Sequence, residues 1–270
     1  MGVASVIVAL LVVTVGAAFL FKPAAKVSAK PTKSASAAPT ATPSSGAVTQ
    51  TGTVKFQGKP PPIVACGAQQ PPDAGDPKPQ FSGPPKQTIK PDDTYTAVMS
   101  TSCGTVEIQL DPVGTPVATN NFVFLADKHF YDGIWFQRIV KNFMIQGGDP
   151  VGTGSGGPGY EFDTEVNQTI KFGDKPGVIA YANSGPNTNG SQFFITVDPQ
   201  SFLDTNGPYT AFGTVTKGLN VLKKISNLPA TTAPAGCAGQ SEACRTKQAV
   251  YINSITINVT KPKPSPSATP

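Results

Sequence analysis

The sequence predicts a mainly β domain, a closed antiparallel barrel of seven or eight short strands whose ends are capped by two α-helices. Two observations carry this prediction. Along residues 92–260, short apolar segments alternate with polar residues and are separated by Gly, Pro and Asn, which is the pattern of strands and turns. Gly and Pro supply 27 and 28 of the 270 residues and charged residues only 14%, which excludes a helical bundle or a coiled coil.

Residues 3–21 (VASVIVALLVVTVGAAFLF) form an uncharged, mostly apolar run. Because this is about the length of a helix that crosses a bilayer, residues 1–21 are predicted to be a transmembrane anchor or a signal segment. The first lysines all follow the run, which by the positive-inside rule alone favours the cytoplasm for the domain. The even number of cysteines favours the opposite side. We therefore expect a single-pass protein of the cell membrane with its domain outside the cytoplasm, or a secreted protein if the segment is cleaved.

Three segments flank the domain. Residues 22–50 are mostly Ala, Ser, Thr, Pro and Lys, with no acid and no aromatic residue, which predicts a disordered linker. Residues 51–91 contain ten prolines and are expected to form an irregular arm, because proline cannot donate to a β-ladder. The tail 261–270 (KPKPSPSATP) is predicted to be unstructured.

The predicted domain starts with a β-hairpin of residues 94–101 and 104–111. In its second strand Val106, Ile108 and Leu110 alternate with polar residues, as expected of a strand with one face in solvent.

A helix follows the hairpin. Thr115 before Pro116 is a helix start, and apolar residues continue at helical spacing to His129. The remaining segments are expected to be strands at 134–140, 143–148, 178–183, 192–197, 211–217 and 249–259, with a second helix at 219–227.

The net charge of +5 is unevenly distributed. Residues 92–260 carry ten Lys or Arg against fourteen Asp or Glu, so the basic balance belongs to the flanking segments. A nucleic-acid-binding domain needs a basic face, and nucleic acid is therefore not an expected partner. The single histidine disfavours most metal sites and catalytic triads. We expect no metal, no cofactor and a monomer.

Two segments of the domain are chemically unusual. FQRIVKNFMIQGGDP places Arg138, one of two arginines, between apolar residues. Because a buried guanidinium is costly when unpaired, Arg138 is either half of a structural ion pair or a donor that faces a ligand. ANSGPNTNGSQFFIT is either a long turn beside core phenylalanines or a groove with amide groups above an apolar pocket.

Other polar residues carry less weight. His129 continues the apolar stripe of the first helix and is interpreted as a structural or partly exposed histidine rather than a catalytic one. Asp163 and Glu165 alternate with aromatic residues, so a strand edge is a simpler account than paired catalytic carboxylates. Residues 152–159 lack the Lys and Ser/Thr of a phosphate loop and are interpreted as a surface loop.

The strings FQRIVKNFMIQGGDP, GTGSGGPGYEF and ANSGPNTNGSQFFIT, followed by SFLD and AFGTV, closely resemble the cyclophilin family of peptidyl-prolyl cis-trans isomerases. The resemblance covers about residues 94–259. It implies an eight-stranded barrel closed by two helices, with the substrate in an outer groove. Phe202 and Tyr209 stand where the best-known eukaryotic members have tryptophan and histidine, and both changes resemble bacterial cyclophilins. Phenylalanine in place of tryptophan at position 202 implies weak cyclosporin binding.

The resemblance also implies site residues. The arginine of the first string is the main catalytic residue of the family, which is Arg138 here. The proline pocket corresponds to Phe143, Met144, Phe194 and Leu203, with Phe202 at its edge. Tyr209, near the following strand, is a further implied substrate-binding residue. The polar groove corresponds to Gln146, Ala182, Asn183 and Gln192.

The expected function is prolyl isomerisation of exported proteins, with proline-containing polypeptides as partners. A donor near the prolyl nitrogen favours the twisted peptide bond, so no nucleophile or metal is required. The alternative is a non-catalytic proline-peptide-binding chaperone or assembly module on the same scaffold.

Four cysteines allow three pairings. Cys237 and Cys244 share one short loop and can meet at little entropic cost. This leaves Cys66 and Cys103, and we expect these two disulfides.

Overall fold

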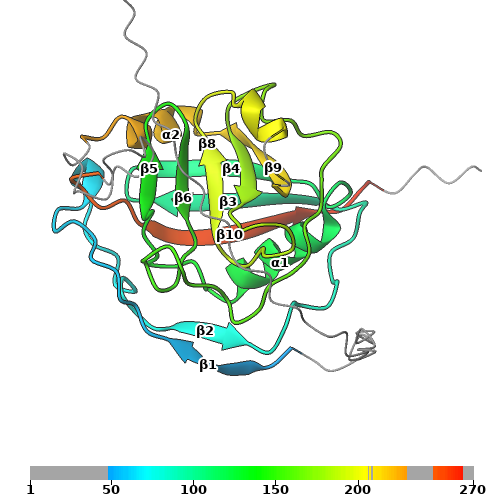
Figure 1. Cartoon of the computed structure of the whole chain (residues 1–270), viewed down its shortest axis with the longest axis horizontal. Helices are drawn as coiled ribbons and strands as arrows, with labels where there is room; N and C mark the ends of the chain where they lie inside the picture. Colours follow the sequence, from blue (N-terminus) through cyan, green and yellow to red (C-terminus); the bar gives the residue numbers. More distant parts are fainter. Residues whose placement is uncertain (1–47, 206, 208, 230–245, 264–270) are drawn as a thin grey trace, which may run out of the picture. The chain divides into compact units, whose positions relative to one another are not determined.

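The computed structural model describes residues 48–205, 207, 209–229 and 246–263, which all belong to one compact unit. Eight antiparallel strands form a single curled sheet in the order β10-β3-β4-β9-β7-β8-β6-β5 (Figure 1). The strands are β3 (Thr94–Thr101), β4 (Gly104–Leu110), β5 (Arg138–Val140), β6 (Met144–Gly147), β7 (Val178–Tyr181), β8 (Phe193–Thr196), β9 (Ala211–Lys217) and β10 (Ile252–Thr260). The helices are α1 (Pro116–Asp127) and α2 (Leu219–Ser226), with a 3-10 turn η2 (Ser201–Asp204).

The predicted closed barrel is wrong, because the edge strands β10 and β5 do not pair with each other. Instead, residues just before β5 make main-chain hydrogen bonds across the gap to residues just before and at the start of β10. Phe136 N donates to Val250 O at 2.9 Å, and Ile252 N donates to Ile134 O at 2.8 Å. The sheet is therefore an open, curled half-barrel. Irregular segments of the chain connect its two open edges by hydrogen bonds.

The predicted hairpin is confirmed as β3 and β4, which pair from Thr96 with Gln109 to Thr101 with Gly104. Its apolar side chains alternate inward, as period-two patterning requires. The core within the curl is aromatic: the Phe122 ring of α1 lies 5.1 to 5.7 Å from three other rings, those of Tyr131, Phe193 and Phe212.

Both predicted helices are present. α1 has Pro116 at its first position and buries Ala118, Phe122 and Leu125. It ends at Asp127, two residues before His129, whose φ is +53°. The His129 side chain is 80% exposed beside Asp132, so it does not continue the apolar stripe, whereas the expectation of an exposed histidine agrees with the structure.

The Pro-rich segment is more regular than the irregular arm that we expected. β1 (Gln50–Val54) and β2 (Lys78–Phe81) form an antiparallel pair, with the 3-10 turn η1 (Ala65–Gly67) between them (Figure 1). Pro79 lies within β2 and is tolerated because a two-stranded sheet leaves one side of each strand without ladder bonds.

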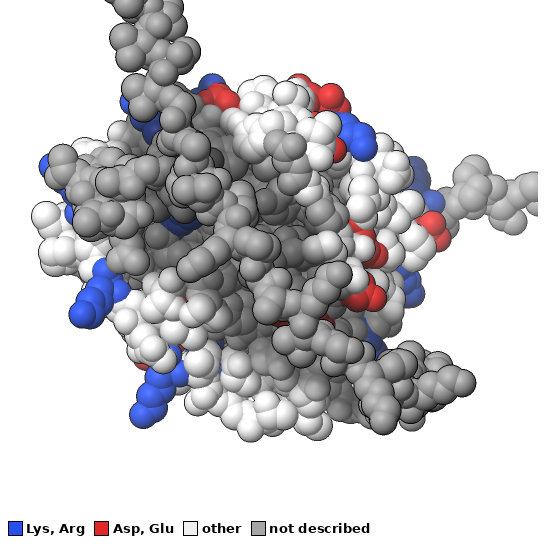
Figure 2. Space-filling model, viewed as in Figure 1, with Lys and Arg blue, Asp and Glu red and all other residues white. Residues whose placement is uncertain are grey.

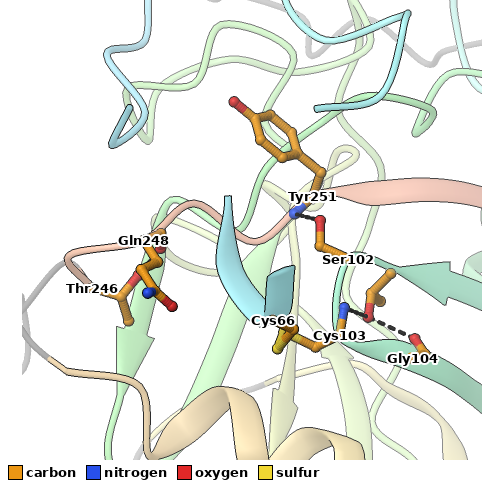
Figure 3. Close-up of a disulfide and its surroundings, with 8 residues drawn as sticks. Cys66, Ser102, Cys103, Gly104, Thr246, Gln248 and Tyr251 are labelled. Atoms are coloured by element: carbon orange, nitrogen blue, oxygen red, sulfur yellow. Dashed lines mark hydrogen bonds between the residues drawn. A yellow bond between two sulfur atoms is a disulfide. The ribbon is translucent and has the colours of Figure 1, made fainter. Parts of the chain in front are cut away.

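A disulfide between Cys66 of η1 and Cys103 of the β3–β4 turn is present, as predicted (Figure 3). Beside it, Tyr251 N donates to Ser102 Oγ at 3.0 Å, which joins the same turn to the start of β10 (Figure 3). The predicted Cys237–Cys244 bond lies outside the described residues.

No helix in the described part of the chain is long and apolar enough to cross a membrane. The apolar run 3–21, most of the linker 22–50 and the end of the tail 261–270 lie outside the described residues.

Candidate active site

The candidate site lies on the sheet face opposite the aromatic core. Strand alternation directs Ile145 and Phe193 into the core, whereas Met144 and Phe194 join a second, smaller apolar cluster. Pairing of β6 with β8 sets Gln146 opposite Phe194, and pairing of β5 with β6 sets Arg138 opposite Gln146. Three short strands therefore bring the sequence-predicted residues together.

A pocket of about 210 Å³ opens on this face. Nine of the eleven site residues that the resemblance implied line it: Arg138, Phe143, Met144, Gln146, Ala182, Asn183, Phe194, Leu203 and Tyr209. Met144, Phe194 and Leu203 are buried and provide an apolar floor. The Tyr209 ring stands edge-on to the Phe194 ring, with centroids 5.4 Å apart.

The other two implied residues lie beside this pocket. Phe202 is 44% exposed, and its ring centroid is 5.4 Å from that of Phe143, which itself lines the pocket. Gln192 lines a second pocket, of about 460 Å³, that shares Gln146, Ala182 and Asn183 with the first.

A chain of carboxamides joins the two pockets. Arg138 Nη1 donates to Gln146 Oε1 at 3.2 Å, and Gln146 Nε2 donates to Gln192 Oε1 at 3.1 Å. Gln192 Nε2 then donates to the carbonyls of Gly154 and Gly156, at 3.0 and 2.9 Å. The half-buried Arg138 is thus hydrogen-bonded to its own sheet partner, Gln146, where the guanidinium lines the first pocket.

Gln137 and Gln80 are among the residues of the site that sequence reasoning missed. Gln137 donates from Nε2 to the same Gln192 oxygen at 3.0 Å, and Gln80 of β2 lines the second pocket. Gln137 stands next to Arg138 in the motif, so its position was the available signal. Gln80 lies in a proline-rich segment, and no local pattern connects it with the site.

Charge is sparse around the site. Among the described residues that line the two pockets, Arg138 and Glu161 are the charged ones. On the face in Figure 2, where described residues are visible, charges of both signs are scattered, and neither forms a continuous surface. Within the described part of the chain, no three His, Cys, Asp or Glu residues cluster as metal ligands would.

A family model described as "Cyclophilin type peptidyl-prolyl cis-trans isomerase/CLD" matches residues 96–257. The chain belongs to this family. Its matched region is a peptidyl-prolyl cis-trans isomerase domain, and both pockets are built mainly from it.

Curated relatives agree with this assignment. The chain is 46% identical over 134 residues to peptidyl-prolyl cis-trans isomerase-like 1 of Neurospora crassa, covering 48% of this chain and 80% of that protein. It is also 46% identical over 145 residues to the human "Peptidylprolyl isomerase domain and WD repeat-containing protein 1". That match covers 52% of this chain and 22% of the human protein, so the chain spans about a fifth of that relative's length.

A solved cyclophilin-type isomerase of Cryptosporidium parvum has the same fold. The TM-score is 0.54 at 31% identity, over 63% of this chain and 99% of that one. A second structure of this protein, described as in the presence of the dipeptide Ala-Pro, gives a TM-score of 0.53 at 33% identity, over 60% of this chain and 98% of that one.

These findings correct the predicted location. The relatives named here are eukaryotic proteins, whereas we expected a bacterial, exported or membrane-anchored type. The described residues contain no membrane-spanning helix. The relatives contradict the expected single-pass protein of bacterial type with an extracytoplasmic domain.

Proposed function

We propose that this protein accelerates rotation about X-Pro peptide bonds in polypeptides, without a covalent intermediate, and that Arg138 is its catalytic residue. The observation that carries the proposal is the guanidinium of Arg138 at the rim of an apolar pocket, held by Gln146 at 3.2 Å. Export of the substrates is not part of the proposal, because it depended on the location that is corrected above.

The barrier that such an enzyme must lower is electronic. Conjugation of the nitrogen lone pair with the carbonyl resists rotation by ~18–20 kcal/mol, and X-Pro bonds populate both isomers. In the twisted state the lone pair localises on the prolyl nitrogen. A fixed N–H donor beside that nitrogen stabilises the twisted state more than either planar isomer, and such a difference is what accelerates a reaction.

The pocket supports proline as the group that is bound. Met144, Phe194 and Leu203 offer a dry floor for a pyrrolidine ring, while Gln146 and Asn183 offer amide groups to the flanking main chain. The related Cryptosporidium structure with Ala-Pro favours the same class of ligand.

The test is a protease-coupled isomerisation assay on a proline tetrapeptide, with peptide affinity measured in parallel by NMR titration. We expect the isomerisation rate to rise in proportion to protein concentration. Saturable peptide binding without any acceleration would instead show the non-catalytic module that is the alternative on this scaffold.

A further inference from the structure

The N-terminal arm, residues 48–91, precedes the family match at 96–257 but reaches the second pocket. Gln80 of β2 lines this pocket together with residues of the glycine loop, which we define as 152–159. The arm is thus an addition to the family domain that contributes a side chain to its peptide site.

Main-chain and side-chain hydrogen bonds hold the glycine loop to the arm at both ends. At the far end of the loop, Gln80 Nε2 donates to Gly157 O at 2.8 Å, and Phe81 N donates to Pro158 O at 2.8 Å. Just before the loop begins, Val151 O accepts from the main-chain N–H groups of 57 and 58, each at 2.9 Å.

Close packing adds to these bonds. Gly152 (φ +77°) lies directly against the Phe56 ring, with no room for a Cβ. At Gly159 (φ +96°), a Cβ would lie 2.8 Å from Phe81 O. Since L side chains rarely adopt such φ values, glycine at these two positions permits both the turn and the contact with the arm.

The arm is itself fixed to the domain. The Cys66–Cys103 disulfide ties η1 to the β3–β4 turn (Figure 3). The buried Phe81 ring packs edge-on against Phe124 of α1, with centroids 5.0 Å apart. An arm anchored in this way can act as a rigid wall of the pocket.

The glycine loop in turn contacts the carboxamide chain of the site. Its Gly154 and Gly156 carbonyls accept from Gln192, which accepts from Gln146, the partner of Arg138. Gln80 therefore stands at the outer end of a hydrogen-bonded path that runs through the loop to the proline pocket.

We propose that Gln80 is a specificity-determining residue, and that the arm holds the glycine loop in the conformation that binds the residues next to the proline. The inference rests on the proposed proline-peptide binding. Apart from Glu161, the described lining of the second pocket is uncharged, with carboxamides, hydroxyls and main-chain groups. The substrates favoured are therefore peptides with hydrogen-bonding side chains beside the proline.

The experiment compares two substrates by NMR exchange spectroscopy. The short one, acetyl-Ala-Pro-amide, fills the proline pocket alone, and the long one is an eight-residue peptide with Ser and Gln around a central Ala-Pro. Gln80→Ala is expected to raise KM for the long peptide about fivefold, the scale of one hydrogen bond, with kcat and the short peptide unchanged within about twofold. Gln80→Met, which keeps the length and removes the amide, is expected to do the same.

Gln50→Ala is the matched control, because Gln50 lies exposed in the same two-stranded sheet and its side-chain amide donates to Gly52 O, two residues away. Equal changes for both peptides, no change for the long one, or an effect in Gln80→Ala that Gln80→Met lacks would each overturn the proposal. Peptide Kd values are measured alongside. If the wild-type protein binds but does not isomerise, the proposed function fails, while the Kd ratio of the two peptides still decides the role of Gln80.

Discussion

Glu165 caps helix α1 from a distant loop: its Oε2 accepts the main-chain N–H of Ala118 at 2.8 Å, and its Oε1 that of Val117 at 3.1 Å. The first N–H groups of a helix have no partner within the helix, and a carboxylate there also interacts favourably with the helix dipole. The strand-edge interpretation of Glu165 is therefore corrected to a helix cap.

Glu165→Ala is expected to lower the free energy of unfolding by about 1–2 kcal/mol, the scale of a lost cap. This change in the free energy of unfolding is measured by urea denaturation, with circular dichroism as the signal. Asp163→Ala is the control, because Asp163 is exposed and lies two residues away. Equal stability of the two variants would contradict the capping role.

The Cys66–Cys103 disulfide is expected to stabilise the protein by restricting the unfolded chain. Replacing both residues with serine should lower the free energy of unfolding by about 2–4 kcal/mol, and reductant should then have no further effect through this pair. Cys237→Ser with Cys244→Ser is the matched control, which isolates the second predicted bond. A non-reducing peptide map that joins Cys66 to Cys237 or Cys244 would contradict both pairings.

Burial raises the pKa values of the Tyr131, Tyr160 and Tyr181 hydroxyls above the ordinary value of tyrosine. These groups stay neutral in the folded protein, whereas unfolded tyrosine ionises near pH 10. The contribution of these three hydroxyls to the free energy of unfolding is fully present below about pH 10. It is lost as the pH rises further, by up to about 1.4 kcal/mol per group per pH unit.

Alkaline denaturation curves, with tyrosinate absorbance followed in parallel, check this pH dependence. The slope of stability against pH should decrease in Tyr160→Phe, which removes one of the three groups. Ionisation of all six tyrosines near pH 10 while the fold persists would be the opposite result.

The family resemblance implies that Phe202 stands where cyclosporin-sensitive members have a tryptophan whose N–H contacts the drug. The Phe202 ring stands at the edge of the site, beside Phe143, and offers no N–H donor. We expect weak cyclosporin inhibition, strengthened by about tenfold in Phe202→Trp, the scale of one gained hydrogen bond to the drug. Strong inhibition of the unmodified protein in the isomerisation assay would refute this expectation.

Local signals predicted the parts of the fold whose contacts are local. The β3–β4 hairpin follows from alternation at Val106, Ile108 and Leu110, and α1 follows from Pro116 with apolar helical spacing. The predicted closure of the barrel was wrong, because closure depends on which segments far apart in the sequence pair with each other. Backbone groups of residues 133–136 bond to residues 250–252, and nothing in either segment marks that pairing as irregular.

The residues of the candidate site likewise fall into those that local sequence patterns predicted and those that depend on distant contacts. Residues inside the family strings were predicted, and eight of them line one pocket together with Tyr209, which lies just outside the strings. Gln80 was not predicted, because its contact with Gly157 depends on how a proline-rich arm folds back against the domain. The β1–β2 pair was missed for a related reason: proline excludes a central strand but not a strand of a two-stranded sheet.

The central claim is that Arg138 supplies the electrostatic stabilisation of the twisted X-Pro bond. The most direct measurement is the isomerisation rate of Arg138→Ala, with peptide Kd and thermal melting measured on the same sample. We expect the rate to fall by on the order of 10²-fold or more while the fold and peptide binding persist. Arg138→Lys should restore little, because an ammonium lacks the planar, multi-donor geometry of guanidinium. A folded Arg138→Ala protein with near-normal turnover would contradict the account, since the acceleration would then come from the apolar pocket alone.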